Sequence, residues 1–321
     1  MRTARTGGVV WSCVLVALAA LVGCGGAKGG HALAPNELTA DQIDADPMTL
    51  LPPSPTAVAN VDARAFYTSG TLGAQLASVS EKVIPLGDDA GFKASRDVDR
   101  VVAASYSTQG ADVVAVVSGR FDEAKIEAAA QTQAANGTSG VAESDYAGHH
   151  VFTVNGAGFA ILTPKTALAG TQAALRRALD RVHDGKNKRE IAQWMQDTLA
   201  TPNAAAAVAV DFTQPLTTAA IGSFQISFAK GLKTVRAVAD FKPPGMHLAS
   251  TLTYADAASA ASASSGMKAA ATMESLVALT GLAPKLHDVS INTADADVQV
   301  SLAVDDQAMR KMIAILPQMV H

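Results

Sequence analysis

The sequence predicts an α+β protein built from two tandem, similar units whose antiparallel sheets are packed by helices. Several runs alternate between apolar and polar residues with period two, which is typical of strands with one buried face. Landmarks in the first half of the chain return in the second half at a constant offset, which favours an internal duplication. Within each unit, the order of the expected strands and helices is that of the split βαβ, ferredoxin-like arrangement, extended by a strand and a helix.

The clearest strands are expected in the second unit. In the run 298–304, apolar residues alternate with Gln299, Ser301 and Ala303, and the run 246–254 alternates in the same way. Such runs predict strands of an antiparallel sheet with one wet or lightly covered face. Further strands are predicted at 100–106, 112–118 and 234–241.

Two pairs of landmarks share an offset of 134 residues. Asp122 and Asp256 each follow a pair of predicted strands and open an Ala-rich segment, where an aspartate can cap the first turn of a helix. The last helix of each unit, at 175–182 and at 309–316, has apolar residues at the same spacing. Earlier helices are expected at 69–83 and 214–230.

The chain divides into five predicted segments. Residues 25–47 are rich in Gly, Pro and Asp and show no sustained apolar period, which predicts a flexible tether. The predicted organisation is a signal peptide (1–23), a tether (24–47), a first α+β unit (48–183), a connecting helix (184–201) and a second α+β unit (202–321).

The N-terminus has the features of a secretory leader. Arg2 and Arg5 precede an apolar stretch at 9–21, and small residues follow it. The stretch is shorter than the roughly 20 apolar residues of a membrane-spanning helix.

The end of this leader resembles the lipobox of bacterial lipoproteins, with the sequence Leu21-Val22-Gly23-Cys24. The resemblance implies cleavage between Gly23 and Cys24, thioether lipidation of Cys24, and acylation of the new N-terminus. Two or three acyl chains anchor a protein stably, whereas one binds only marginally. Position 25 is Gly rather than Asp, so in a Gram-negative host the resemblance implies sorting to the outer membrane. In a Gram-positive-type host it implies a lipoprotein of the cell surface. An ordinary secretory signal with a coincidental cysteine is the alternative.

Composition narrows the classes of partner and chemistry. The two cysteines are Cys13, inside the leader, and Cys24, so the rest of the mature chain has no disulfide, thiolate nucleophile or cysteine metal site. Loss of the leader removes Arg2 and Arg5 but no acidic residue, which changes the net charge from −4 to −6. With no basic run of five, nucleic acid is a poor partner.

No motif predicts catalytic, cofactor-binding or metal-binding residues. Two Ser-x-x-Lys matches, Ser227 to Lys230 and Ser265 to Lys268, lack the companion motifs of penicillin-binding proteins. The adjacent His149 and His150 would point to opposite faces of a strand, so they cannot readily share an ion. Asp97 and Asp99 form a carboxylate pair, for which we favour a loop that caps backbone groups and pairs with Arg96 or Arg100. Gly156-Ala157-Gly158 is predicted to be a hairpin turn.

The body loosely resembles uncharacterised lipoproteins of delta-proteobacterial type. The residues that carry this resemblance are the Pro-rich start that leads into Ala59-Asn60-Val61-Asp62, Gly91-Phe92 ahead of Asp97-Val98-Asp99-Arg100, and Gly119-Arg120-Phe121-Asp122. The resemblance brings no known activity.

We therefore expect a lipid-anchored envelope protein that binds an envelope partner or supports envelope structure without catalysis. One alternative is a carrier of lipid or another hydrophobic ligand, in which Ala-rich residues 256–273 and Met309, Met312 and Met319 line a cavity. The other alternative is an envelope hydrolase with an unrecognised site.

Overall fold

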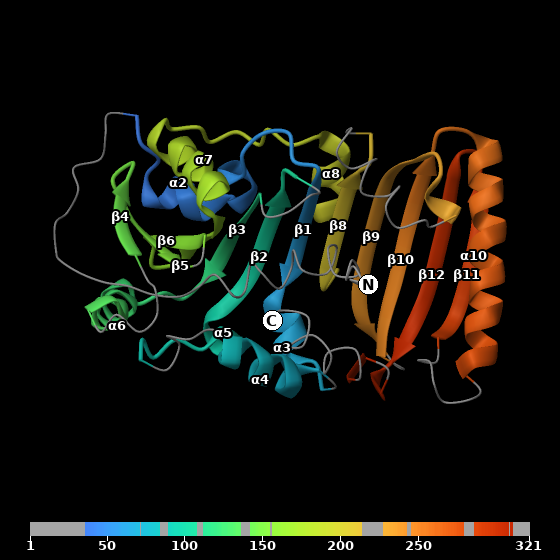
Figure 1. The fold of residues 1–321 in the computed structure, drawn as a ribbon, viewed down its shortest axis with the longest axis horizontal. Helices are drawn as coiled ribbons and strands as arrows, with labels where there is room; N and C mark the ends of the chain where they lie inside the picture. The colour runs from blue at the N-terminus through green and yellow to red at the C-terminus, as the bar shows by residue number, and fades with distance from the viewer. Residues whose placement is uncertain are drawn as a thin grey trace, which may run out of the picture.

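In the part of the chain that the structure describes, twelve strands form one continuous antiparallel sheet, in the order β11-β12-β10-β9-β8-β1-β2-β3-β7-β6-β5-β4 (Figure 1). The computed structural model describes residues 36–70, 72–83, 89–107, 112–135, 142–154, 156–213, 227–242, 245–278, 286–307 and 309–310. The strands are β1 (Ala57–Asp62), β2 (Val98–Ser105), β3 (Val113–Gly119), β4 (Ala142–Tyr146), β5 (His149–Val154), β6 (Ala157–Thr163), β7 (Thr166–Thr171), β8 (Ala206–Asp211), β9 (Leu232–Lys242), β10 (Gly245–Tyr254), β11 (Leu286–Ala294) and β12 (Asp297–Asp305).

Helices lie on both faces of this sheet. They are α2 (Ala40–Ala45), α3 (Ala63–Thr68), α4 (Gly73–Val83), α5 (Ala94–Asp97), α6 (Glu123–Ala135), α7 (Gln172–His183), α8 (Gln193–Leu199) and α10 (Ala257–Ala278), with short 3₁₀ helices η1 (Pro47–Leu50) and η2 (Ser227–Ala229). Among the described residues, no helix is both long and apolar enough to span a membrane.

The two faces of the sheet can be followed through the strand register, because successive side chains of a strand point to opposite faces. We call face A the face that carries Val102 of β2 and Val116 of β3, which are paired. Face B carries their neighbours Val101 and Val117. Each face of the first half contributes to its own hydrophobic cluster.

The first half of the sheet is covered on both faces. On face A, a cluster joins the sheet to α7, α8 and the N-terminal segment, with Leu50, Leu175 and Met195 almost fully buried. On face B, residues of α3, α5 and α6 pack on the same strands, together with Phe92 and Phe121.

The second half is covered chiefly on face B. There α10 packs on Tyr254 and Val298, while Leu72, just before α4, packs on Met246. Figure 1 shows α10 beside β11 at one end of the sheet and α4 along its lower edge. On face A, α8 contacts β9 at the margin of this half. The prediction that 246–254 and 298–304 have one wet face is thus confirmed.

The ferredoxin-like prediction is only partly realised. The element β10–α10–β11 is a split βαβ, since β12 lies between the two strands and is antiparallel to both. The first two strands of each half, however, are adjacent and antiparallel, which a split βαβ does not allow. Between α6 and α7 the structure has four strands, whereas the split βαβ order extended by one strand would place two there. The broader prediction, an α+β fold with antiparallel strands packed by helices, is correct.

The predicted flexible tether (24–47) is wrong from residue 36 onward. A capping box at Thr39 begins α2, and Leu38 and Ile43 are buried against the sheet. Asp44 accepts hydrogen bonds from the hydroxyls of Thr163 and Thr166, at 2.6 and 2.7 Å. We call residues 36–47 the N-terminal strap. Its composition is mostly polar, because only Leu38 and Ile43 are buried, and so the sequence did not predict that it docks on the sheet.

Both aspartates predicted as helix caps have that role. The Asp122 carboxylate accepts a hydrogen bond from the backbone N–H of Lys125, and the Asp256 carboxylate accepts one from that of Ser259. The predicted helix at 175–182 is the central part of α7. Of the other predicted helices, 214–226 and 311–316 lie outside the described residues. The predicted connecting helix (184–201) is limited to α8.

Candidate functional site

A cavity of about 420 Å³ lies where the α8–β8 turn meets face A of β9, β10 and β12. It occupies the corner between the helix-covered and uncovered parts of this face. Its lining residues are Thr201, Pro202, Asn203, Ala204, Val238, Ala239, Asp240, Lys242, His247, Leu248, Ala249, Asp288, Ser301 and Leu302.

Asp240 and His247 are directly opposite each other on β9 and β10, and both line the cavity. Asp240 Oδ2 accepts a hydrogen bond from Lys242 Nζ at 2.5 Å. Asp240 Oδ1 is shielded from solvent and has no hydrogen-bond partner among the described residues. A buried acceptor left without a partner costs about 1–3 kcal/mol, so this oxygen marks a place where a donor from outside the protein would be stabilising.

Two irregular backbone positions bring further polar side chains to the cavity. Asn203 has φ 59° in the turn after Pro202, and Asp288 has φ 51° in the β-bulge of β11. Asn and Asp tolerate this left-handed conformation better than most residues. Ser301, on β12, completes a set that contains both donors and acceptors. The cavity can therefore hold a ligand that both donates and accepts hydrogen bonds.

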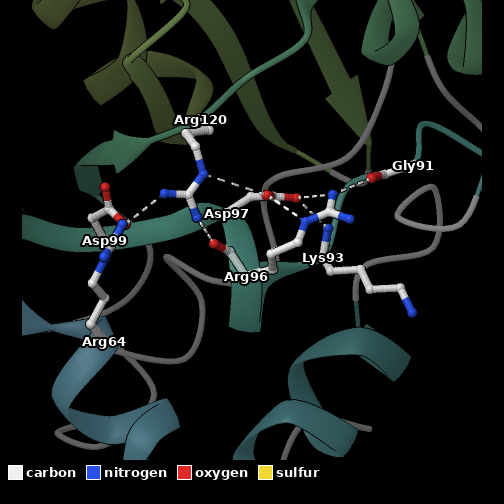
Figure 2. Close-up of polar contacts among 7 residues, drawn as sticks. All are labelled: Arg64, Gly91, Lys93, Arg96, Asp97, Asp99 and Arg120. Atoms are coloured by element: carbon white, nitrogen blue, oxygen red, sulfur yellow. Dashed lines mark hydrogen bonds and ion pairs between the residues drawn. The ribbon is translucent and has the colours of Figure 1, made fainter.

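The carboxylate of Asp97 is the centre of a second polar cluster, near the start of β2 (Figure 2). Asp97 is 6% exposed. It accepts hydrogen bonds from Arg96 Nε and Nη2 at 2.7 and 2.6 Å, and from the Lys93 backbone N–H at 2.9 Å. Arg96 also donates to the Gly91 carbonyl, so this carboxylate closes the loop before β2.

Asp99 has different partners. Arg64 of α3 donates to it at 2.5 Å, and Arg120 lies 3.7 Å away (Figure 2). Arg120 also lies 3.9 Å from Asp97, so it links the two carboxylates. The prediction of capping and ion pairing is confirmed for Arg96, whereas Arg64 and Arg120 take the place that we assigned to Arg100. With these cationic and backbone partners, the cluster joins α3, α5, β2 and the end of β3.

We expect this cluster to make stability depend on acid pH. Burial raises the pKa of Asp97, but hydrogen bonds from Arg96 and Lys93 and the charge of Arg120 outweigh it, so the pKa lies below its ordinary value of 3.8. A carboxyl with a lowered folded-state pKa stabilises the fold above its unfolded-state pKa, and this contribution is lost as pH falls through the folded-state value. Urea unfolding of wild type and Asp97→Asn should therefore differ at pH 7 and converge below about pH 4. A difference that stayed constant with pH would contradict this origin.

The remaining sequence candidates do not assemble into a reactive group. Ser265 donates its hydroxyl hydrogen to the Ala261 carbonyl within α10, which is a structural bond. His149 lies 3.5 Å from Glu37 of the N-terminal strap, whereas His150 lies 2.8 Å from Asp145. Among the described residues, no group of three or more His, Cys, Asp or Glu side chains could hold a metal ion.

The lipidation and cleavage residues, Cys24 and Gly23, lie outside the described residues. The cavity residues were missed by the sequence analysis. They come from five separate segments, and the one local signal was the Thr201-Pro202-Asn203 turn, which predicted the start of the second unit but no binding role.

Comparison with models of known families gives no match, and comparison with curated protein sequences gives none. Among solved structures, the fold is similar to that of TP0453 in its crystal form III, with a TM-score of 0.50 and 9% identity over 84% of this chain and 97% of that one. Crystal forms I and IV of TP0453 give TM-scores of 0.47 and 0.49 at 9% and 8% identity, over 85% and 84% of this chain and 98% and 96% of those chains. The likeness to form III supports a mixed α+β fold with a large antiparallel sheet.

Proposed function

We propose that this protein is a lipid-anchored envelope protein that binds a partner without catalysis, through face A of its second half. The observation that carries the proposal is the unequal covering of the sheet. Described helices cover both faces of the first half but leave most of face A of β9, β10, β12 and β11 uncovered. We call this surface the open face; its exposed residues are Arg236, Lys242, Ala249, Asn292, Ala294, Gln299 and Ser301.

The composition of the open face supports binding of a polar partner. Its exposed side chains are small, polar or charged, and acidic residues such as Asp297 lie at its margins. Such a surface is stable in water, yet it presents a rigid set of hydrogen-bonding groups on paired strands.

The proposed anchor keeps this surface near the bilayer. Asn36, where the described strap begins, is twelve residues from Cys24. A fully extended chain of that length reaches about 40 Å. Because residues 36–47 are docked on the sheet, the connection between Cys24 and the fold is shorter than the predicted tether (24–47).

The anchor is tested by acyl labelling of the full chain. A Cys24→Ser variant is expected to lose incorporation of labelled palmitate, because the thioether that begins lipoprotein maturation cannot form. The matched control is Cys13→Ser, inside the leader, which should keep wild-type labelling. Palmitate retained by Cys24→Ser would contradict the anchor.

The binding surface is tested by site-specific crosslinking. Because the sequence after Cys24 has no cysteine, a cysteine placed at Gln299 would be the single free thiol of the lipidated protein. A benzophenone attached there should give adducts of one defined mass in the envelope. The same probe at the exposed Gln131 of α6 should not give them. Equal adducts from both positions, or none from Gln299, would contradict the assignment of the open face.

Lipid that co-purifies with the protein would instead favour the alternative function, a carrier of lipid or another hydrophobic ligand.

We further propose that the two halves are duplicated units. Three correspondences support this: β1, β2 and β3 are followed by α6, as β8, β9 and β10 are by α10; Asp122 and Asp256 cap those helices; and β1 pairs with β8 symmetrically. At this seam, Asp62 N–H donates to Ala205 and Asp211 N–H donates to Thr56, each at 2.8 Å. Asp62 corresponds to Asp211 and Thr56 to Ala205, each pair separated by 149 residues. Exchanging the two halves therefore turns one bond into the other, as expected for an isologous contact.

A further inference from the structure

We propose that the cavity beside Asp240 binds a carbohydrate unit, which donates a hydroxyl hydrogen to Asp240 Oδ1. This rests on the proposed binding function and deepens it by naming a class of ligand. The cavity is the concave part of the open face, walled on one side by the turn at Thr201–Ala204.

The hydrogen bonding of Asp240 favours a ligand that donates. One carboxylate oxygen is held by Lys242, while the other is shielded from solvent and has no partner among the described residues. An acceptor in this state is matched by a ligand hydroxyl or amine, and a hydrogen bond to a charged acceptor is stronger than one between neutral groups.

The lining of the cavity mixes hydrogen-bond donors and acceptors. Lys242 and the Asn203 amide can donate, Asp288 can accept, and the hydroxyls of Thr201 and Ser301 can do both. A sugar hydroxyl also donates and accepts, so a ring with several hydroxyls can satisfy such a set.

The charges that line the cavity favour a neutral ligand. Two carboxylates, Asp240 and Asp288, disfavour a phosphate or another dianion. Lys242, already paired to Asp240, leaves these three groups with a formal net charge of −1. An uncharged carbohydrate avoids repulsion by the carboxylates and adds no positive charge beside Lys242.

The shape of the cavity agrees with this class. A volume of about 420 Å³ is at the lower end of the range for small-molecule sites. Pro202 and Val238 add apolar surface to the lining, against which the C–H groups of a sugar ring can pack.

The test uses the full chain in a detergent without a sugar headgroup, with cellobiose, maltose and chitobiose as probes in saturation-transfer NMR. We expect at least one disaccharide to bind with a Kd of about 1 mM or tighter. Asp240→Asn should weaken its binding by about tenfold. A Ser301→Ala variant should weaken binding as well, which guards against an Asp240→Asn protein that is misfolded.

The matched control is Asp295→Asn, the same change at an exposed hairpin position with φ 50° that lies outside the cavity. This variant should bind as wild type does. Absence of saturable binding by all three disaccharides would overturn the proposal, and so would equal binding by wild type and both cavity variants. Neither result depends on the anchor or on an envelope partner, so this failure is distinguishable from failure of the crosslinking test.

Discussion

An Arg181→Ala variant of the full chain is expected to lose about 3 kcal/mol of unfolding free energy, because the carbonyl groups that its buried guanidinium binds lose their hydrogen-bond donor. Arg181 is 3% exposed on α7. Its guanidinium donates to the carbonyls of Thr49 and Lys188, at 2.9 and 2.7 Å, and to the carboxylate of Glu190. It therefore ties η1, which follows the N-terminal strap, and the loop after α7 to one helix. Urea unfolding followed by circular dichroism measures the loss.

The control for this prediction is Arg189→Ala. Arg189 pairs with Asp46 at 2.5 Å, but both side chains are partly exposed, at 38% and 27%. Exposed ion pairs contribute at most about 1 kcal/mol. If both variants lost equal stability, the strap would depend on total charge rather than on the buried contacts of Arg181.

A Gly119→Ala variant is expected to be destabilised by about 3 kcal/mol, at the upper end of the usual cost of overpacking. A Cβ at Gly119 would lie 2.1 Å from the Asp97 carbonyl oxygen, which is backbone and cannot rotate away. The clash would also separate Asp97 from Arg120, whose N–H donates to the same carbonyl at 2.8 Å. The expected readout is a lower urea midpoint at pH 7.

The control is the same substitution at Gly266, within α10. A Cβ there meets no atom within 4 Å, and alanine is a better helix former than glycine. Gly266→Ala should therefore raise the unfolding free energy, by up to about 1 kcal/mol. Destabilisation by both alanines would show that close approach to Asp97 is not the cause.

Local signals in the sequence predicted the strands and caps well. The alternation at 246–254 and 298–304 depends only on which face is buried, and each cap at Asp122 and Asp256 depends on three neighbouring residues. The union of both halves into one sheet could not be predicted, because β1 and β8 are short Ala- and Val-rich strands that do not specify which edge they pair with. The docked strap was missed for a similar reason: its contacts with Thr163 and Thr166 join residues more than 100 positions apart.

The candidate site was even less predictable from local sequence than the fold. Asp240 and His247 become neighbours through the β9–β10 register, whereas Asn203 and Asp288 reach the cavity through irregular backbone at a turn and a bulge. None of these residues carries a motif. For the Asp97 cluster, the local partner Arg96 was predictable, but Arg64 and Arg120 depend on the packing of α3 and β3.

Native mass spectrometry of the mature protein, extracted from membranes, tests most directly whether lipid is the anchor of this protein rather than its cargo. The account predicts a chain that begins at Cys24, carries two or three covalent acyl chains, and retains no stoichiometric non-covalent lipid. A chain that begins elsewhere without acyl groups would contradict the anchor. One non-covalent lipid retained per chain would contradict the binding module in favour of a carrier.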